Sequence, residues 1–393
     1  MVLNKIKPKI LRITTIPASL RYLLRGQFSF FNDRGFDVQI ASSDGADGYY
    51  IQENENIEFH KIPLTRAITP LQDIYCIILL YRLIRKERFK IVHSHTPKAG
   101  LIAMIAAWLA IVPVRLHTVA GLPLMEATGM KKRILLLTER LTYMFATKVY
   151  PNSFSMSEYI TREVYSNTAK LKVLANGSSN GIDLNYFSKN DLLLAQSLEL
   201  RYELNIPSNS KVGIFIGRLV GDKGINELIE ATAEIMESES DFHLILVGSF
   251  ENELDPLEVE TMEKILEISN IHVLGFQSDV RPYLLASDFL AFPSYREGFP
   301  NVPLQAGAMG LPAIVSDING CNEIIIDEYN GLIVQPKNVM SLRNAMCRLL
   351  NDEKLIMSLK GNSRKSIEDR FDRILVWEAL FFEYNDQLNT YVY

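Results

Sequence analysis

The chain has 393 residues, which is too long for one ordinary hydrophobic core and predicts two domains. Hydrophobic residues make up 48% of the chain and charged residues 22%, which is ordinary for a soluble globular protein. The net charge of −5 is unevenly divided. Residues 1–175 carry 24 Lys and Arg against 13 Asp and Glu, a net +11, and the remainder carries 17 against 33, a net −16. No nucleic-acid motif accompanies the basic half, so nucleic acid is not an expected partner, and an anionic surface or a phosphate-bearing acceptor suits this half better.

The sequence predicts neither an exported nor a membrane-spanning segment. Residues 1–10 carry charges without a following apolar block, so no signal peptide is expected. The longest apolar run, from Gly100 to Val114, is shorter than the roughly 20 residues that a spanning helix needs, which favours a buried helix. The three cysteines have neither metal nor redox spacing, and a reducing cytoplasm fits them.

Strand and helix patterns alternate along the whole chain, which predicts an α/β protein with parallel sheets. In the first half the expected strands are 10–15, 37–41, 59–63, 91–94, 115–119, 148–150 and 171–175, and helices are expected at 71–88 and 131–146. The second half restarts with strands 212–216, 243–247, 271–274, 288–292, 313–315 and 332–334 and a helix at 225–236.

The boundary between the two domains is expected between Asp183 and Asn209, in a segment that contains Pro207 and the start of a polar run. The last helix is expected to begin near Asp369, with an apolar stripe formed by Phe371, Ile374, Leu375 and Phe382. These features predict one domain over 1–188, a second over 189–370, and a terminal helix over about 371–393.

A glycine-rich turn follows the first strand of the second half. It runs from Gly217 to Gly224, with the sequence GRLVGDKG, and it opens the helix at 225–236. The glycines allow close backbone approach, and Arg218 and Lys223 can converge on a diphosphate. The plain alternative is a solvated turn with two surface cations.

A loop with the sequence EGFPN follows the strand at 288–292. It places Glu297 before a short helix, expected over 302–309, that carries Gln305 in its first turns. In open α/β sheets, ligands lie where a loop at the end of a strand leads into a helix N-terminus. The sequence therefore predicts a ligand site at this loop.

These residues resemble the retaining glycosyltransferases of the GT-B fold, in the family GT4. That family has two Glu separated by seven residues, of which Glu297 is the first and Gln305 stands in place of the second. The stretch EGFPNVPLQAGAMGLPAIVSDINGCNEI is most similar to the branch that acts on lipid-carrier-linked sugars for surface polysaccharides. The resemblance implies two Rossmann-like domains that face a cleft, the first binding the acceptor and the second the nucleotide sugar.

The resemblance also implies a role for individual residues of the second half. Arg218 and Lys223 would bind the donor diphosphate, with Gly217 beside them. Glu297 would hold donor-sugar hydroxyls, and Gln305 would reach the ribose. The base would lie against Gly275 and Phe276, for which a core position is the alternative. The backbone that cradles the sugar and phosphate would come from Gly298, Phe299, Pro300, Asn301 and Val302.

In the first half, the resemblance places His117 near the reacting sugar. His93 and His95 have no partners spaced to complete a zinc site. Thr96 and Pro97 are typical of a helix start, which puts Lys98 beside a helix N-terminus, where phosphates bind. Lys98 and His95 are therefore the expected acceptor-binding residues, and an ordinary exposed lysine is the alternative for Lys98.

A basic cluster, here called the basic helix end, ends the helix at 71–88 and consists of Arg82, Arg85, Lys86, Arg88 and Lys90. A solvated helix end is its default interpretation. Together with the net charge of the first half, it predicts peripheral contact with the inner face of the cytoplasmic membrane.

The function that these observations predict is a metal-independent retaining glycosyltransferase without a cofactor. Its donor would be a nucleotide sugar, with UDP as the expected nucleotide, and its acceptor a lipid-linked glycan. No Asp-x-Asp motif is present to hold a metal. Two alternatives remain open from the residues: a sugar-nucleotide 2-epimerase of the same fold, and a non-catalytic scaffold that kept a donor site.

Overall fold

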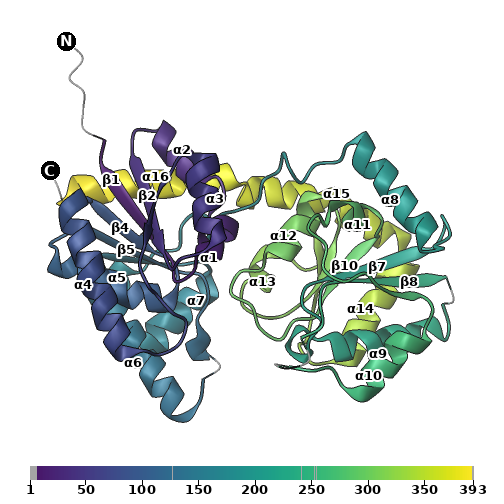
Figure 1. Ribbon diagram of the computed structural model, residues 1–393. Helices are drawn as coiled ribbons and strands as arrows, with labels where there is room; N and C mark the ends of the chain where they lie inside the picture. The colour runs from purple at the N-terminus through teal and green to yellow at the C-terminus, as the bar shows by residue number, and fades with distance from the viewer. Residues whose placement is uncertain (1–6, 126, 240, 252, 254, 392–393) are drawn as a thin grey trace. The chain divides into compact units, whose positions relative to one another are not determined.

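The computed structural model describes residues 7–125, 127–239, 241–251, 253 and 255–391 (Figure 1). The chain forms two compact units. The first is Met1–Gly181 together with Arg373–Tyr393, and the second is Ile182–Asp372. The chain passes between the units at Gly181 and again at Asp372. The boundaries predicted from the sequence were residues 188 and 370. Residues 1–6 of the predicted first domain and 392–393 of the predicted last helix lie outside the described residues.

The first unit is built on a six-stranded parallel sheet with the strand order β3-β2-β1-β4-β5-β6. Its strands are β1 (Lys9–Ile13), β2 (Asp37–Ser42), β3 (Glu58–Lys61), β4 (Ile91–Ser94), β5 (Val114–Val119) and β6 (Lys148–Pro151). Its helices are α1 (Pro17–Leu23), α2 (Gln27–Asp33), α3 (Ala46–Glu55), α4 (Pro70–Glu87), α5 (Pro97–Leu109), α6 (Gly129–Phe145), α7 (Phe154–Tyr159) and α16 (Arg373–Tyr391).

Two separate cores cover the two faces of this sheet, because alternate residues of each strand point to opposite sides. On one face α4, α5 and α6 pack against Leu11, Ile13 and Val92. On the other face α2, α3 and α16 pack against Ile10 and Ile91. The apolar run from Gly100 to Val114 gives most of α5, which is largely buried up to Ala107, whereas Trp108, Leu109 and Ile111 are exposed. No helix among the described residues is long and apolar enough to cross a membrane.

The strand predicted at 171–175 is wrong. Leu171 makes a single bridge to Val149, and the next residues leave the sheet. Ala175 adopts a positive φ of 49°, at the start of the turn in which the amide of Gly177 bonds the carbonyl of Leu174. A chain that turns within four residues cannot extend a ladder, so β6 is the edge strand.

The second unit contains another six-stranded parallel sheet, with the strand order β12-β11-β10-β7-β8-β9. Its strands are β7 (Lys211–Ile216), β8 (Phe242–Val247), β9 (Ile271–Val273), β10 (Phe289–Phe292), β11 (Ala313–Ser316) and β12 (Gly331–Val334). Its helices are α8 (Asp191–Glu203), α9 (Ile225–Met236), α10 (Val259–Glu267), α11 (Arg281–Leu285), α12 (Asn301–Ala308), α13 (Cys321–Ile324), α14 (Val339–Asn351) and α15 (Glu353–Phe371). All six strands predicted in this half are present.

The predicted apolar stripe of the last helix is wrong. Asp372 leaves helical geometry, with ψ at 131°, and separates α15 from α16. The face that α16 buries is therefore set anew at Arg373 and does not continue the phase of Phe371. Phe382 is 67% exposed, and Ile374 and Leu375 are also exposed. The buried apolar residues are Val376, Trp377, Leu380, Tyr384 and Leu388.

In both sheets the strand order reverses beside the first strand. The chain runs outward from β7 to β8 and β9 and then returns to β10 on the other side of β7. The first sheet does the same between β1 and β4. Loops that leave the carboxyl ends of two such strands part in opposite directions, which opens a ligand crevice at that point.

Candidate active site

The glycine-rich turn follows β7 at the point where the strand order reverses. Gly221–Lys223 forms one 3-10 turn, and α9 begins directly after Gly224. Gly224 has a φ of 71°, and a Cβ there would lie 2.2 Å from the carbonyl oxygen of Pro293, in the loop after β10. Only glycine allows the two loops to approach this closely.

The loop after β10 carries Glu297 and is held by side chains on both sides. Ser294, which is fully buried, donates its hydroxyl to Glu297 Oε1 at 3.0 Å. Asn319 donates from Nδ2 to the carbonyl oxygens of Glu297 and Gly298, at 3.1 and 2.7 Å. Gly320, at a φ of 76°, would bring a Cβ within 2.5 Å of the Gly298 carbonyl oxygen. The loop is thus fixed before α12 begins at Asn301.

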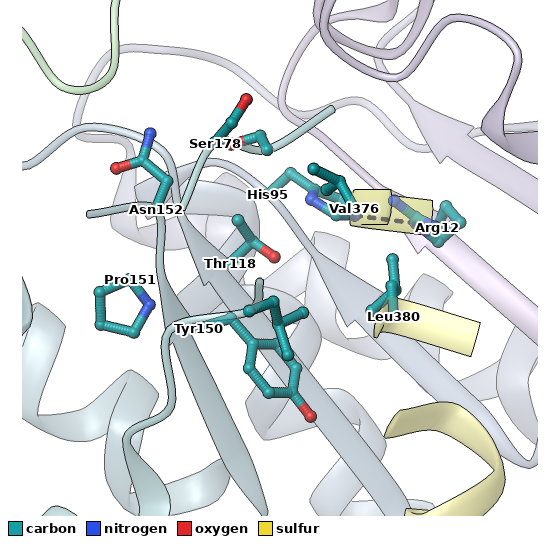
Figure 2. Close-up of a pocket in the computed structure, with 11 residues that line it drawn as sticks. Arg12, His95, Thr118, Tyr150, Pro151, Asn152, Ser178, Val376 and Leu380 are labelled. Atoms are coloured by element: carbon teal, nitrogen blue, oxygen red, sulfur yellow. Dashed lines mark hydrogen bonds between the residues drawn. The ribbon is translucent and has the colours of Figure 1, made fainter. Parts of the chain in front are cut away.

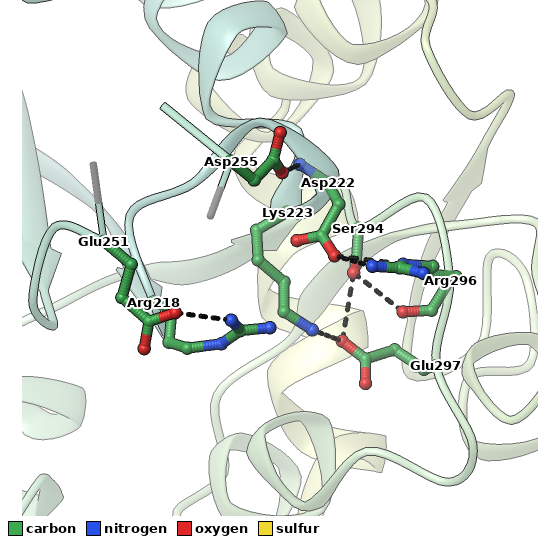
Figure 3. Close-up of polar contacts among 8 residues, drawn as sticks. All are labelled: Arg218, Asp222, Lys223, Glu251, Asp255, Ser294, Arg296 and Glu297. Atoms are coloured by element: carbon green, nitrogen blue, oxygen red, sulfur yellow. Dashed lines mark hydrogen bonds and ion pairs between the residues drawn. The ribbon is translucent and has the colours of Figure 1, made fainter. Parts of the chain in front are cut away.

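Each predicted diphosphate cation is paired with a carboxylate (Figure 3). Lys223 donates to Glu297, and both side chains are largely buried, with 15% and 16% exposed. Arg218 bonds Glu251 at 2.7 Å, with 47% of the Arg218 side chain exposed. This hydrogen bond to Glu251 raises the pKa of Arg218. The structure therefore brings Arg218, Lys223 and Glu297 to one place, and their binding of a donor diphosphate stays a prediction.

Sequence reasoning missed the acidic residues around these cations. Glu251 lies four residues beyond β8, and Asp255 accepts the amide of Asp222 at 2.6 Å. Arg296 in turn bonds Asp222 at 2.5 Å, and so ties the turn to the loop after β10. The run of acidic residues after β8 was the available signal, but only the pairing of β7 with β8 brings it beside Arg218.

The remaining predicted donor residues lie at the same edge of the sheet. Gly275 follows β9, and its carbonyl oxygen accepts a hydrogen bond from the Gly248 amide at 2.8 Å. Phe276 is 76% exposed, so the alternative of a core position for its ring is excluded. Gln305 lies in α12 and is partly buried, and among the described residues its side chain makes no hydrogen bond. These residues are free to contact a nucleotide, which stays a prediction.

The predicted residues of the first unit are more enclosed. His117 is 1% exposed, bonds Ser94 Oγ through Nδ1 at 2.8 Å, and lies against Gly100 of α5. Burial lowers its pKa to about 3, so the ring is neutral. Its contact with a reacting sugar stays a prediction, and in this structure α5 covers the ring.

Lys98 and His95, the predicted acceptor-binding residues, both have partners within the first unit. Lys98 pairs with Asp73 at 2.8 Å and bonds the hydroxyls of Thr65 and Thr69, both at 2.9 Å. Thr96 precedes α5 but does not cap it, because its hydroxyl bonds Thr15. His95 is 4% exposed and accepts a hydrogen bond from Arg12. Acceptor binding by either residue stays a prediction.

Comparisons with known proteins cover both units. Residues 196–366 match the family model described as "Glycosyl transferases group 1", and residues 24–177 match "Glycosyl transferase 4-like domain". The "Capsular polysaccharide biosynthesis glycosyltransferase CapM" of Staphylococcus aureus is 32% identical over 96% of this chain and 97% of its own. The "UDP-Gal:alpha-D-GlcNAc-diphosphoundecaprenol alpha-1,3-galactosyltransferase" of Escherichia coli is 29% identical over 94% of each chain.

Solved structures share the architecture. Anabaena Alr3699/HepE in complex with UDP has a TM-score of 0.81, at 20% identity over 97% of this chain and 100% of that chain. WaaG, described as a glycosyltransferase involved in lipopolysaccharide biosynthesis, has a TM-score of 0.69, at 17% identity over 94% and 97%. At these identities the likeness concerns the fold.

Proposed function

Because this chain belongs to the group 1 glycosyl transferases, we propose that it moves a sugar from a UDP sugar to a polyprenyl-diphosphate-linked acceptor, with retention of configuration, in surface polysaccharide synthesis. The chain is a glycosyltransferase with the GT-B fold, as its sequence predicted. The observation that carries the proposal is the gathering of Arg218, Lys223 and Glu297 where the strand order of the second sheet reverses.

The donor assignment is supported by the chemistry of the leaving group. As the bond to the sugar breaks, the departing nucleoside diphosphate gains negative charge, and fixed cations at that position stabilise the transition state. Arg218 and Lys223 supply two such charges beside the first turns of α9 and α12, whose free amides also favour anions. UDP is the proposed nucleotide because Alr3699/HepE was solved with it and the E. coli relative is named for a UDP sugar.

The acceptor assignment is supported by what the relatives are named for. The E. coli relative acts on a sugar linked to diphosphoundecaprenol, and a Campylobacter jejuni relative, 28% identical, is named for the same kind of carrier. In the proposed reaction an acceptor hydroxyl attacks the anomeric carbon of the donor sugar from the same face on which the leaving group departs, so no enzyme nucleophile is required. Glu297 would hold donor-sugar hydroxyls, and Gln305 would hold the ribose.

The direct test is a transfer assay on the purified chain with a panel of UDP sugars and a short-chain polyprenyl-diphosphate sugar. We expect one donor to give a product whose new linkage has the anomeric configuration of the donor, and activity should persist in excess chelator. Among the described residues, no group of three or more His, Cys, Asp or Glu is placed to hold a metal ion. An isomerised free sugar nucleotide would instead support the epimerase. The absence of both transfer and hydrolysis would support the scaffold.

Gln305→Ala is expected to weaken donor binding and to leave turnover largely unchanged. A hydrogen bond to the ribose acts before and during the reaction alike, and such uniform binding is expressed in KM. One neutral hydrogen bond corresponds to about 1 kcal/mol, or roughly a fivefold rise in KM for the donor. Steady-state kinetics measure both constants. Loss of turnover with unchanged donor affinity would place Gln305 at the chemical step.

The proposed membrane contact lies on the helices that cover one face of the first sheet. Helix α4 leaves an apolar stripe exposed at helical spacing, formed by Leu71, Ile74, Tyr75, Ile78 and Tyr81. All five residues of the basic helix end are also exposed. Helix α6 repeats the combination with Met130, Ile134 and Leu137 beside Lys131, Lys132 and Arg133. Apolar and basic side chains together fit an anionic membrane interface, which we take to be the inner face of the plasma membrane.

Replacing Arg85, Lys86 and Arg88 with serine is expected to reduce flotation with anionic vesicles. Each basic residue near an anionic surface contributes on the order of 1 kcal/mol, and salt weakens the attraction. The matched control replaces three exposed cations of the second unit, Arg348, Lys354 and Lys365. Equal flotation of the two variants would indicate that the basic helix end is an ordinary solvated helix end.

A further inference from the structure

The first unit contains a small polar pocket that the proposed reaction does not use. It lies at the carboxyl ends of β4, β5 and β6 and is closed by α16 (Figure 2). Its volume is about 20 Å³, which is room for a single particle of about the size of a water molecule. The polar residues that line it are Arg12, His95, Thr118, Asn152, Ser178 and Ser179.

Arg12 is a buried cation whose recorded partners are all neutral. Its side chain is fully buried, and it donates to His95 Nε2 at 2.9 Å, to Tyr384 Oη at 3.0 Å and to Gln27 Oε1 at 2.8 Å. A guanidinium has five N–H groups, so two remain after these bonds. Among the described residues no carboxylate pairs with it, and Glu383, the buried carboxylate of α16, pairs with Lys172. A buried charge without a counter-ion costs several kcal/mol.

The hydrogen bonds around Arg12 fix which atoms carry protons. Because Arg12 donates to Nε2 of His95, the neutral ring of His95 carries its proton on Nδ1. Burial holds the pKa of His95 well below its usual value, which keeps the ring neutral. His95 Nδ1 is buried and has no partner among the described residues, so it offers an unused donor.

A second chain of short contacts extends from Arg12 to Thr118. Tyr384 accepts from Arg12, and its hydroxyl lies 2.7 Å from His93 Nδ1. His93 Nε2 lies 2.8 Å from Thr118 Oγ1. One unpartnered acceptor, Asn152 Oδ1, lies away from Arg12 on the other side of Thr118 (Figure 2).

We propose that this pocket binds one small monoatomic anion, chloride under cellular conditions, against the Arg12 guanidinium. The anion supplies the charge that Arg12 lacks, and it accepts from the two unused N–H groups of Arg12. Ser178 and Ser179 lie just before the chain leaves the first unit at Gly181, and Val376 just after it returns at Arg373, so the anion braces both connections.

The test compares the thermal unfolding of the full chain in sodium chloride and in sodium methanesulfonate at matched ionic strength. Both tryptophans, Trp108 and Trp377, belong to the first unit, so their emission follows its unfolding. We expect a saturable upward shift of the midpoint of about 3 °C for a tenfold excess of chloride over its dissociation constant. Sulfate at the same ionic strength should not reproduce the saturation.

Gln27→Glu is the informative variant, because it places a carboxylate on the atom that already accepts from Arg12. The new charge replaces the anion, and the chloride-dependent shift should disappear. The matched control, Gln335→Glu, makes the same change at an exposed position of the second unit and should keep the shift. Equal shifts in wild type and Gln27→Glu would overturn the proposal.

A direct measurement holds even if Gln27→Glu fails to fold. Crystals of the wild-type chain grown in bromide should show an anomalous peak in the pocket, within contact distance of Arg12. A peak elsewhere with only water in the pocket would overturn the proposal.

Discussion

Lys223→Ala is expected to lower turnover at least about a hundredfold, which is the scale of removing one charge that stabilises a developing anion. Lys223 is held at the reversal point of the second sheet, and it donates to Glu297, the residue proposed to hold the donor sugar. Its removal takes away both a diphosphate contact and the orientation of Glu297. Because the loss occurs in the transition state, kcat should fall along with kcat/KM.

Both cations are paired with carboxylates, so a variant of one of these carboxylates can be compared with Lys223→Ala. Arg218 is bound to Glu251, so a donor diphosphate must displace that carboxylate. Glu251→Gln weakens the competing pair and should lower the donor KM while keeping turnover. Both variants should still fold, since neither side chain belongs to a hydrophobic core, but Lys223→Ala should lower the unfolding midpoint because it leaves the largely buried Glu297 without its cation. Near-normal turnover in Lys223→Ala would contradict the diphosphate assignment.

Mild acid is expected to destabilise the first unit steeply. Burial lowers the pKa values of His93 and His95 well below the usual value and that of His117 to about 3. In the unfolded chain the same groups titrate near pH 6.5, so below that pH the unfolded state binds three protons that the folded state refuses. The stability that these groups supply is complete above about pH 6.5 and is lost as the pH falls.

Glu139 acts in the opposite direction. Its burial raises its pKa to about 7, so the folded state binds a proton before the unfolded state does. Between about pH 7 and 4.5 its proton uptake therefore offsets part of the slope of unfolding free energy against pH that the three histidines cause. Denaturant unfolding followed by tryptophan emission at several pH values measures this slope. Glu139→Gln removes the opposing group and should steepen the slope, and a flat profile would contradict the burial of these histidines.

Much of the fold was accessible from the sequence because both sheets are parallel and buried on two sides. Their strands are short apolar runs, and every predicted strand of the second sheet is present within two residues of its expected bounds. The failures have local causes. Residues 171–175 looked like a strand by composition, but the positive φ of Ala175 turns the chain away. The stripe predicted for α16 assumed one continuous helix, and Asp372 resets its phase.

The site was predictable where one short segment carries its own chemistry. The glycine-rich turn and the Glu297 loop each contain their own candidate residues, and the adjacency of β7 and β10 brings the two segments together. The partnership of Arg218 with Glu251 joins residues that are 33 apart and depends on which strands pair. The environment of Arg12 was even harder to predict, because its partner Tyr384 lies 372 residues further along the chain.

That distance has a consequence for how the protein is made. The second unit is one continuous segment, but the first unit needs α16, which a ribosome delivers only after the whole second unit. Until α16 emerges, the sheet face that packs Trp377, Leu380 and Tyr384 stays uncovered, and Arg12 lacks one of its three partners. Amino-terminal domains usually fold first during synthesis. Here the second unit can complete its core while the first unit still lacks α16. A nascent chain of this protein therefore exposes an apolar sheet face throughout the translation of about half its length, the interval in which a chaperone has a surface to hold.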